Sequence, residues 1–577
     1  MSPLQSFDVK EKLQQLGLGD KSALVAQVTK HLSSSTSTTN ATWFWVPGRV
    51  EFAGKHTDYC GGESIVFAVP KGFLLAATRD EQAPTDDSPG CTITVVHCVT
   101  DKKSSGKQES WIYLPPGRTS STKDEGSTGA APEPSYAKYF AATWSRLFLN
   151  FGLHLRSSWT IYFASDLPRA SGLSSSSALV VAAFLFAENL SKIGELCDTE
   201  GPEKPLRNFS LTREKLRENP ADLAAYLGCC ENGAPFASSD GSTQLAGSSG
   251  VGTFGGSEDH AAILGVGRVE QLDQASEDGA TINSSSVLTR LSFCPAKVVE
   301  TLPWPTEDYV FIIASSGVLA EKAGGVMQDY NNAVFLARKA IEGIDRYVKK
   351  EQGEAETANL IDILPSTSST LQAAVQSLRA IIPNVEEMDS TDGSQSRSVA
   401  HDATIDVLQA ALVEMSHTDR EVDQTLAAAI CERAVQFANE MELIRHLARA
   451  LRDYKSSAPA PLAGSSEAQQ EKEKANKFEN TLRTCFQESQ DGSDIGLHNI
   501  IAETAYLPAA ALDLGAVASS AFGAGFGGSV FAVVRRSVAD SFLAAWEEDY
   551  YESFPQRKDA AEFFVVEKPA VGAQLLF

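Results

Sequence analysis

The chain has 577 residues, of which 43% are hydrophobic, and a formal net charge of −25 at pH 7. This length exceeds what one hydrophobic core usually supports, so we expect two large domains. The strong negative charge argues against nucleic acids and anionic membrane surfaces as partners.

Strand-like and helix-like segments follow one another in irregular order. Alternating or continuous apolar residues predict strands over residues 42–46, 92–99, 159–164 and 309–314. Helical spacing of apolar residues predicts helices over residues 136–153 and 219–232. Because the order lacks the regular alternation of a doubly wound sheet, we expect an α+β fold class.

Four segments lack any steady apolar period and are rich in Ser, Gly, Pro, Ala or charge. They cover residues 115–135, 237–250, 388–398 and 455–474. We expect surface loops or linkers there.

No segment predicts a membrane span or a secretory signal. The longest apolar run, residues 178–187, ends at Glu188 and is shorter than the roughly 18 residues that a span requires. The first residues are charged at Asp8, Lys10 and Glu11 and hold no apolar signal core. Nine cysteines without a repeated spacing favour free thiols in a reducing compartment. We therefore expect a soluble, cytoplasmic protein.

Residues 168–178 read Pro-Arg-Ala-Ser-Gly-Leu-Ser-Ser-Ser-Ser-Ala and run directly into an apolar stretch typical of a buried helix. The start of a helix offers unpaired backbone N–H groups and the positive end of the helix dipole. Gly172 and the short serines let a phosphate come close to the backbone. The segment predicts a phosphate-binding loop, and the alternative is an ordinary serine N-cap.

Two further segments are dense in polar or glycine residues. Residues 47–62 follow a predicted strand and place Arg, Lys, His and Asp between glycines, which indicates a polar site. Residues 521–530 carry four glycines before an apolar strand-like run. Such a bare backbone can approach a ligand or another chain segment closely.

Together these three segments resemble the sugar-kinase branch of the GHMP kinase superfamily, and most closely galactokinases. Residues 47–62 are similar to the galactokinase signature, residues 168–178 to the phosphate loop, and residues 521–530 to the glycine-rich C-terminal motif. The resemblance implies a ribosomal-protein-S5-like N-terminal domain, residues 1–300, and a ferredoxin-like C-terminal domain, residues 301–577. The active site would lie between them.

The resemblance also implies phosphoryl transfer from ATP with Mg²⁺. That chemistry needs phosphate donors, a magnesium ligand and a carboxylate near the attacking hydroxyl. By resemblance, Ser176 and Glu231 would hold Mg²⁺, which prefers few carboxylates together with water and phosphate oxygens. The implied nucleotide-binding residues are Gly172, Leu173, Ser174, Ser175, Ser176 and Ser177.

Asp259 matches the catalytic aspartate of galactokinases. It would accept the proton of the sugar C1 hydroxyl or orient that hydroxyl, while Arg49 would stabilise the transferred group. Residues 257–260 depart from the usual loop by reading Ser-Glu-Asp-His. Glu258 is therefore an alternative base, and the choice depends on geometry.

Sugar recognition is implied for the segment that follows the first strand. His56 and Asp58 match residues that hold sugar hydroxyls, and Tyr330 matches a tyrosine that lines the sugar pocket. Lys55 departs from the family, because galactokinases place a glutamate there. A lysine that faces the sugar would change specificity. Alternatively, Lys55 pairs with Glu51 or Glu63 and faces away.

These residues predict an ATP-dependent kinase that phosphorylates the anomeric hydroxyl of a monosaccharide. Galactose is the first expectation, and a uronic acid or another hexose or pentose is the alternative. A kinase for a non-sugar alcohol such as mevalonate or homoserine is disfavoured by the His-Thr-Asp-Tyr segment at residues 56–59. A catalytically silent sugar-binding regulator is a third possibility, against which the set Arg49, Ser176, Glu231 and Asp259 argues.

Overall fold

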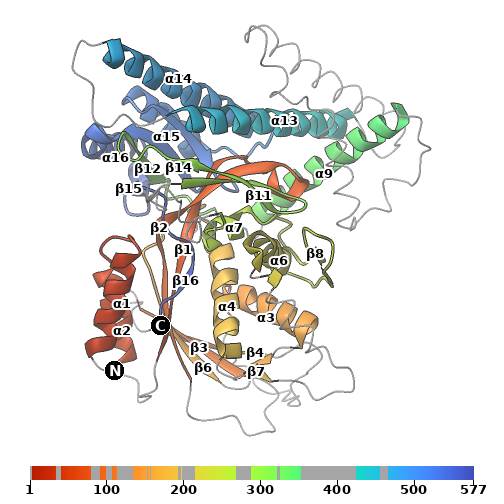
Figure 1. Ribbon diagram of the computed structural model, residues 1–577, viewed down its shortest axis with the longest axis vertical. Coiled ribbons are helices and arrows are strands. Elements are labelled where there is room, and N and C mark those ends of the chain that lie inside the picture. Colours follow the sequence, from red (N-terminus) through yellow and green to blue (C-terminus); the bar gives the residue numbers. More distant parts are fainter. Residues whose placement is uncertain are drawn as a thin grey trace.

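The structure is a computed structural model in which two β-sheets are covered by helices (Figure 1). It describes residues 3–33, 41–79, 91–98, 107–113, 134–152, 154–155, 158–169, 171–192, 196–197, 215–216, 218–267, 287–320, 325–351, 424–454 and 466–577. Among the helices in these ranges, none is both long enough and apolar enough to cross a lipid bilayer.

The first sheet has eight strands. Six of them lie in the order β11-β10-β2-β6-β3-β4, while β1 pairs with β2 and with the C-terminal β16. The strands are β1 (Thr42–Ala53), β2 (Glu63–Arg79), β3 (Cys91–His97), β4 (Gln108–Tyr113), β6 (Trp159–Ser165), β10 (Val287–Ser292), β11 (Lys297–Pro303) and β16 (Gln574–Leu575). Strands β1 and β2 are antiparallel neighbours, so residues 54–62 form the turn between them.

Both faces of this sheet are buried, and β1 shows why its sequence is almost continuously apolar. Side chains alternate between the two faces of a strand. Trp43 and Trp45 accordingly pack with α1 (Pro3–Gln15) and α2 (Ser22–Leu32), whereas Phe44 and Val46 belong to the larger core on the opposite face. That second face is covered by α3 (Ala137–Phe151), α4 (Ser175–Lys192), α6 (Pro220–Asn232) and α7 (Glu258–Leu264).

The second sheet has four strands in the order β13-β14-β12-β15. They are β12 (Tyr309–Ser315), β13 (Ala518–Phe522), β14 (Ser529–Arg535) and β15 (Glu562–Val566). Alternate residues of β12 face two cores: Val310 and Ile312 pack with α15 (Ala502–Asp513) and α16 (Ala539–Ser553), and Phe311 and Ile313 pack toward the long helices. Those helices are α9 (Gly325–Glu351), α13 (Gln424–Asp453) and α14 (Ser466–Ile495), and Figure 1 shows α13 and α14 lying across one end of the molecule.

The predicted α+β class is confirmed, and the predicted helices and strands are found within a few residues of their expected ends, except that the strand predicted over residues 42–46 continues to Ala53. The α6 helix begins after Asn219, whose side chain accepts a hydrogen bond from the backbone N–H of Asp222. The expectation of a loop over residues 455–474 is wrong from Ser466 onward, where α14 begins. Residues 237–250 contain most of a small two-stranded hairpin, β8 (Phe236–Ala237) and β9 (Gln244–Leu245).

The other two expected loops are not tested. Nearly all of residues 115–135, and all of residues 388–398, lie outside the described residues. The chain passes from the first sheet to the second between Pro303 and Tyr309, and it returns to the first sheet with β16. The domain division near residue 301 stays a prediction.

Candidate active site

A cavity with an empty volume of about 470 Å³ lies where the β1–β2 turn, α4, α6, α7 and α9 meet the glycine-rich turn after β13. Five carboxylates, one arginine and two histidines are among its lining residues. The lining consists of Arg49, Glu51, His56, Asp58, Tyr59, Ser177, Glu231, Asn232, Thr253, Gly255, Gly256, Glu258, Asp259, His260, Tyr330, Gly523 and Ala524. Seven sequence-predicted residues therefore share one cavity: Arg49, His56, Asp58, Ser177, Glu231, Asp259 and Tyr330.

Arg49 connects three parts of the site. It lies on β1 and is 3% exposed. Its Nε donates to Oδ1 of Asp259 over 2.5 Å, and its Nη1 donates to the carbonyl of Gly172 over 2.5 Å. Burial lowers the pKa of Arg49, but the charges of Asp259 and Glu51 outweigh that effect and raise the pKa above its usual value. The guanidinium is thus a fixed positive charge between the phosphate loop and α7.

The phosphate loop is shaped by two residues in the left-handed region. Gly172 has a φ of 75° and Ser174 a φ of 60°, and α4 begins at Ser175. The hydroxyl of Ser174 donates to Oδ2 of Asp259. A helix that begins here presents its first N–H groups at the loop, as a phosphate site requires. Five of the predicted nucleotide-binding residues directly precede the lining residue Ser177 in the chain but do not line the cavity themselves. They are Gly172, Leu173, Ser174, Ser175 and Ser176.

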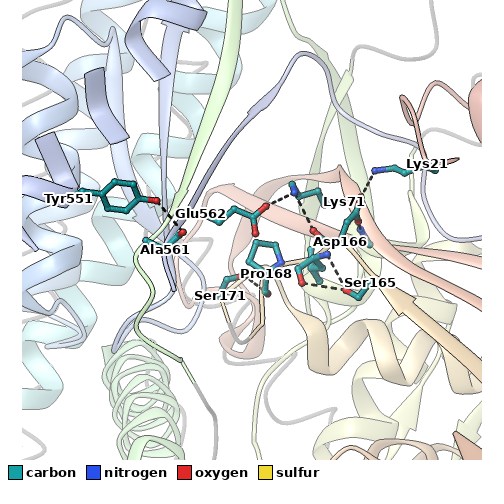
Figure 2. Close-up of polar contacts among 11 residues, drawn as sticks. Lys21, Lys71, Ser165, Asp166, Pro168, Ser171, Tyr551, Ala561 and Glu562 are labelled. Atoms are coloured by element: carbon teal, nitrogen blue, oxygen red, sulfur yellow. Dashed lines mark hydrogen bonds and ion pairs between the residues drawn. The ribbon is translucent and has the colours of Figure 1, made fainter. Parts of the chain in front are cut away.

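The turn that enters the phosphate loop is fastened to both sheets (Figure 2). Asp166 accepts from Lys21 Nζ at 2.5 Å and from the backbone N–H of Gly72 at 2.7 Å. Lys71 donates to the carbonyl of Asp166 and, over 2.5 Å, to Glu562 of β15. These contacts fix the start of the loop relative to β2 and β15.

The glycine-rich motif packs directly on the phosphate loop. The hydroxyl of Ser529 donates to the carbonyl of Ser171 over 2.6 Å. A Cβ added to Gly523 would lie 2.8 Å from the carbonyl oxygen of Gly172, closer than such atoms approach. The prediction that this backbone approaches another segment closely is confirmed, and that segment is the phosphate loop.

Asp58 and His56 are held by the turn that carries them. Oδ1 of Asp58 accepts from the N–H of Tyr59 at 2.8 Å, and Oδ2 accepts from the N–H of Glu258 at 3.1 Å. A Cβ at Gly256 would lie 2.2 Å from Oδ2 of Asp58, so this position requires glycine. His56 has a φ of 59°, and its Nδ1 lies 2.8 Å from the Tyr59 hydroxyl.

The candidate magnesium ligands come from α4 and α6. Glu231 is 6% exposed, and its Oε2 accepts from the hydroxyl of Ser177 at 2.9 Å. The same oxygen lies 3.1 Å from Nε2 of His260. The resemblance implies Ser176 as the second magnesium ligand beside Glu231, whereas the hydroxyl that contacts this carboxylate belongs to Ser177. Successive helical residues point about 100° apart, so the identity of the inward serine depends on where the helix begins.

Glu51 and Glu258 lie in the same cavity, each with an oxygen that has no hydrogen-bond partner among the described residues. Burial raises the pKa of Glu51 to about 7, against the opposing charge of Arg49 and the N–H of Gly523. Burial and the charges of Glu51 and Asp58 raise the pKa of Glu258 well above its usual range. A carboxyl that holds its proton is a poor proton acceptor, which favours Asp259 as the base.

Lys55 does not line the cavity. Its Nζ donates to the carbonyl of Ser489 at 3.2 Å and to the hydroxyls of Ser493 at 2.9 Å and Ser520 at 2.8 Å. Burial lowers its pKa to about 8, against the opposing charges of Glu440 and Glu51. The expected contact with substrate therefore has no geometric support. The alternative expectation, an ion pair of Lys55 with Glu51 or Glu63, is not found either. The ammonium is bound instead by residues of α14 and β13.

Three family models match segments of the chain. The galactokinase galactose-binding signature matches residues 34–79, the GHMP kinases N terminal domain matches residues 136–227, and the GHMP kinases C terminal model matches residues 500–552. They match in the order that the three motifs predict. The chain belongs to the GHMP kinase superfamily.

Two relatives of this GHMP kinase are similar to it in sequence or in fold. A galactokinase of Streptomyces coelicolor is 26% identical over 196 residues, which are 32% of this chain and 41% of the relative. The matched segment therefore spans less than half of that relative. The crystal structure of Lactococcus lactis galactokinase complexed with galactose has a TM-score of 0.54 at 16% identity and covers 96% of this chain and 99% of the other. This second likeness establishes the shared fold.

Some residues of the candidate site belong to no motif in the sequence. Asn499 lies with its Nδ2 3.5 Å from Nε2 of His56, although it precedes α15 by three positions and is far from the signature. His260 lies beside Glu231. Its position next to Asp259 in the Ser-Glu-Asp-His segment was the available signal.

Proposed function

We propose that this GHMP kinase transfers the γ-phosphoryl group of ATP to the anomeric hydroxyl of a neutral monosaccharide, with galactose as the first candidate. The observation that carries the proposal is the placement of Arg49, Asp259 and the phosphate loop in direct contact. Phosphoryl transfer requires an acceptor carboxylate and a fixed cation beside the phosphates. The galactokinase signature over residues 34–79 supports a sugar as acceptor.

Each side chain has a role in that reaction. Asp259 accepts the proton of the attacking hydroxyl or orients it, and Arg49 stabilises the negative charge on the transferred group. His56 and Asp58 hold the sugar hydroxyls, and Tyr330 lines the same cavity. The nucleotide phosphates are bound at the turn from Gly172 through Ser177.

The contact between Ser177 and Glu231 fits Mg²⁺, because magnesium takes one or two carboxylates and fills its shell with water and phosphate oxygens. Bound there, the ion would neutralise charge on the phosphates. Glu231 of α6 and Ser177 of α4 would hold it. We place the enzyme in the cytoplasm, in line with the free thiols of its described cysteines.

The cavity lining argues against a uronic acid as substrate. Five carboxyl groups line the space, among them Asp58, Glu231 and Asp259, and Arg49 is the single arginine or lysine among the lining residues. A second carboxylate on the sugar would be repelled unless a cation accompanied it. A neutral, hydroxyl-rich sugar avoids this cost.

The test is ATP turnover with galactose, glucose, arabinose, galacturonate, mevalonate and homoserine, followed by phosphorus NMR of the product. We expect ADP release with galactose and a product phosphorylated at C1. Turnover with mevalonate or homoserine alone would mean that the protein is not a sugar kinase but phosphorylates a non-sugar alcohol, as other members of the superfamily do. Sugar binding by calorimetry without ADP release would identify a silent regulator.

A further inference from the structure

Helix α13 contacts the β1–β2 turn through a row of buried polar side chains. Arg433 is 0% exposed, Gln436 is 2% exposed and Glu440 is 1% exposed. Positions separated by three and seven residues lie on one face of a helix. This face is polar where a helix that packs on a core is normally apolar, so its side chains need specific partners.

The partners are backbone groups of three consecutive residues. Oε2 of Glu440 accepts from the N–H groups of Gly54 at 3.1 Å and of Lys55 at 3.3 Å. Nε2 of Gln436 donates to the carbonyl of Lys55 at 3.1 Å. Nη2 of Arg433 donates to the carbonyl of His56. Two N–H groups and two carbonyls of residues 54–56 are thus bound by one helix.

The bound segment has a backbone that is unfavourable on its own. His56 has a φ of 59° and Gly54 a φ of 101°, both in the left-handed region. A residue with a Cβ persists there only when its surroundings hold it. The same guanidinium lies 3.2 Å from the hydroxyl of Tyr59, which in turn lies 2.8 Å from Nδ1 of His56. The helix therefore determines where the imidazole of His56 points.

We propose that Arg433, Gln436 and Glu440 are positioning residues that hold the β1–β2 turn so that His56 and Asp58 face the sugar. The inference rests on the proposed function in one respect, that this turn binds the sugar. A guanidinium is charged at every accessible pH and must be given acceptors when buried. It therefore fixes the His56 carbonyl more firmly than a neutral donor would.

The remainder of the helix face fits the same turn. A Cβ at Gly62 would lie 2.9 Å from the Phe437 ring, and the sulfur of Met441 lies 3.2 Å from the N–H of Glu63. Carboxylate Oε1 of Glu440 also accepts from the Ser489 hydroxyl at 2.5 Å, which joins α14 to the arrangement. The turn is enclosed from its first residue to its last.

The test uses Arg433→Met, Arg433→Lys and Gln436→Met, with Arg449→Met as the matched control on the half-exposed side of α13. We expect the galactose KM to rise roughly tenfold to a hundredfold in Arg433→Met, as loss of a charge-assisted hydrogen bond does, with ATP affinity unchanged. Arg433→Lys should restore part of the affinity. Gln436→Met should act in the same direction with a smaller effect, and Arg449→Met should have none.

Amide exchange at residues 54–62 separates this proposal from the proposed function, because it needs no turnover. Exchange should accelerate in Arg433→Met and Gln436→Met and not in Arg449→Met. If the wild type phosphorylates no sugar, the proposed function is wrong. The exchange rates then still show whether α13 holds the β1–β2 turn in place. Unchanged exchange or an unchanged galactose KM in a folded variant overturns the positioning role. So does failure of both Met variants to fold, because the contacts would then serve folding as a whole.

Discussion

Nε of Arg49 donates to Oδ1 of Asp259 over 2.5 Å, across 210 positions of sequence, while Oδ2 of the same carboxylate accepts from Ser174. Both carboxylate oxygens are therefore bound by the two elements that border the phosphate site. Such an aspartate is fixed before substrate enters, and a preorganised charge stabilises a transition state without further reorganisation.

The first prediction concerns Asp259→Asn. Asparagine keeps the shape but removes the negative charge and the proton acceptor. Turnover with galactose should fall by about 100-fold or more, as loss of a general base does, with a smaller change in galactose affinity. Steady-state kinetics and calorimetry measure the two effects. Glu258→Gln is the matched control. A larger loss of turnover in that variant would show that Glu258, and not Asp259, is the general base.

The second prediction distinguishes neighbouring serines of α4. The Ser177 hydroxyl contacts Glu231, whereas Ser176 does not line the cavity. Ser177→Ala should raise the magnesium concentration for half-maximal turnover by roughly tenfold, since a hydrogen bond to a charged group contributes about 1.5–3 kcal/mol. Glu231→Gln should raise it further and Ser176→Ala should not change it. A larger effect of Ser176→Ala in a magnesium titration would restore the assignment that the sequence favoured.

The sequence was sufficient to find the site where each residue belongs to a local motif. Arg49, His56 and Asp58 are close in the chain, and the strand before them is recognisable from its apolar residues. Lys55 was harder, because residues of a tight turn point in directions that only the tertiary structure decides. The partner helix α13 lies more than 370 positions away and carries no motif, so its contacts with residues 54–56 were beyond sequence reasoning.

Helix α14 illustrates the opposite error. Its first turns are rich in Glu, Lys, Gln and Ala, which are strong helix formers, but they lack an apolar stripe. Apolar periodicity alone therefore predicts a loop there. Their high charge instead reflects exposure, since several residues between Gln469 and Lys477 are exposed.

The third prediction concerns Lys55→Met. The ammonium is bound by Ser489, Ser493 and Ser520 and is not among the groups that line the cavity, so the ratio of kcat/KM for galactose and galacturonate should not change. Thermal stability should fall, because the variant removes the charge of Lys55 that favours the ionised form of the buried Glu440. A tenfold change in the specificity ratio would show that Lys55 reads the substrate after all.

The last prediction is a pH effect at Glu51. Its pKa is raised from 4.5 to about 7, so the folded state favours the protonated carboxyl. The contribution of Glu51 to the free energy of unfolding is fully present below about pH 4.5. It is lost as the pH rises through 7, and the total loss is about 3 kcal/mol. Arg49, Lys55, Asp259, Glu258 and Glu440 are the charged groups that interact with Glu51.

Glu51→Gln keeps an oxygen that can accept from the Gly523 N–H but cannot ionise. Its melting temperature relative to wild type should therefore rise between about pH 5 and pH 8, because only the wild type must ionise a buried carboxyl over that range. Thermal melts of both proteins across the range measure this difference. Glu548→Gln, at an exposed position of α16, is the control and should show no such trend. A difference between wild type and Glu51→Gln that does not vary with pH would mean that Glu51 is already ionised in the folded protein, with Arg49 as its partner.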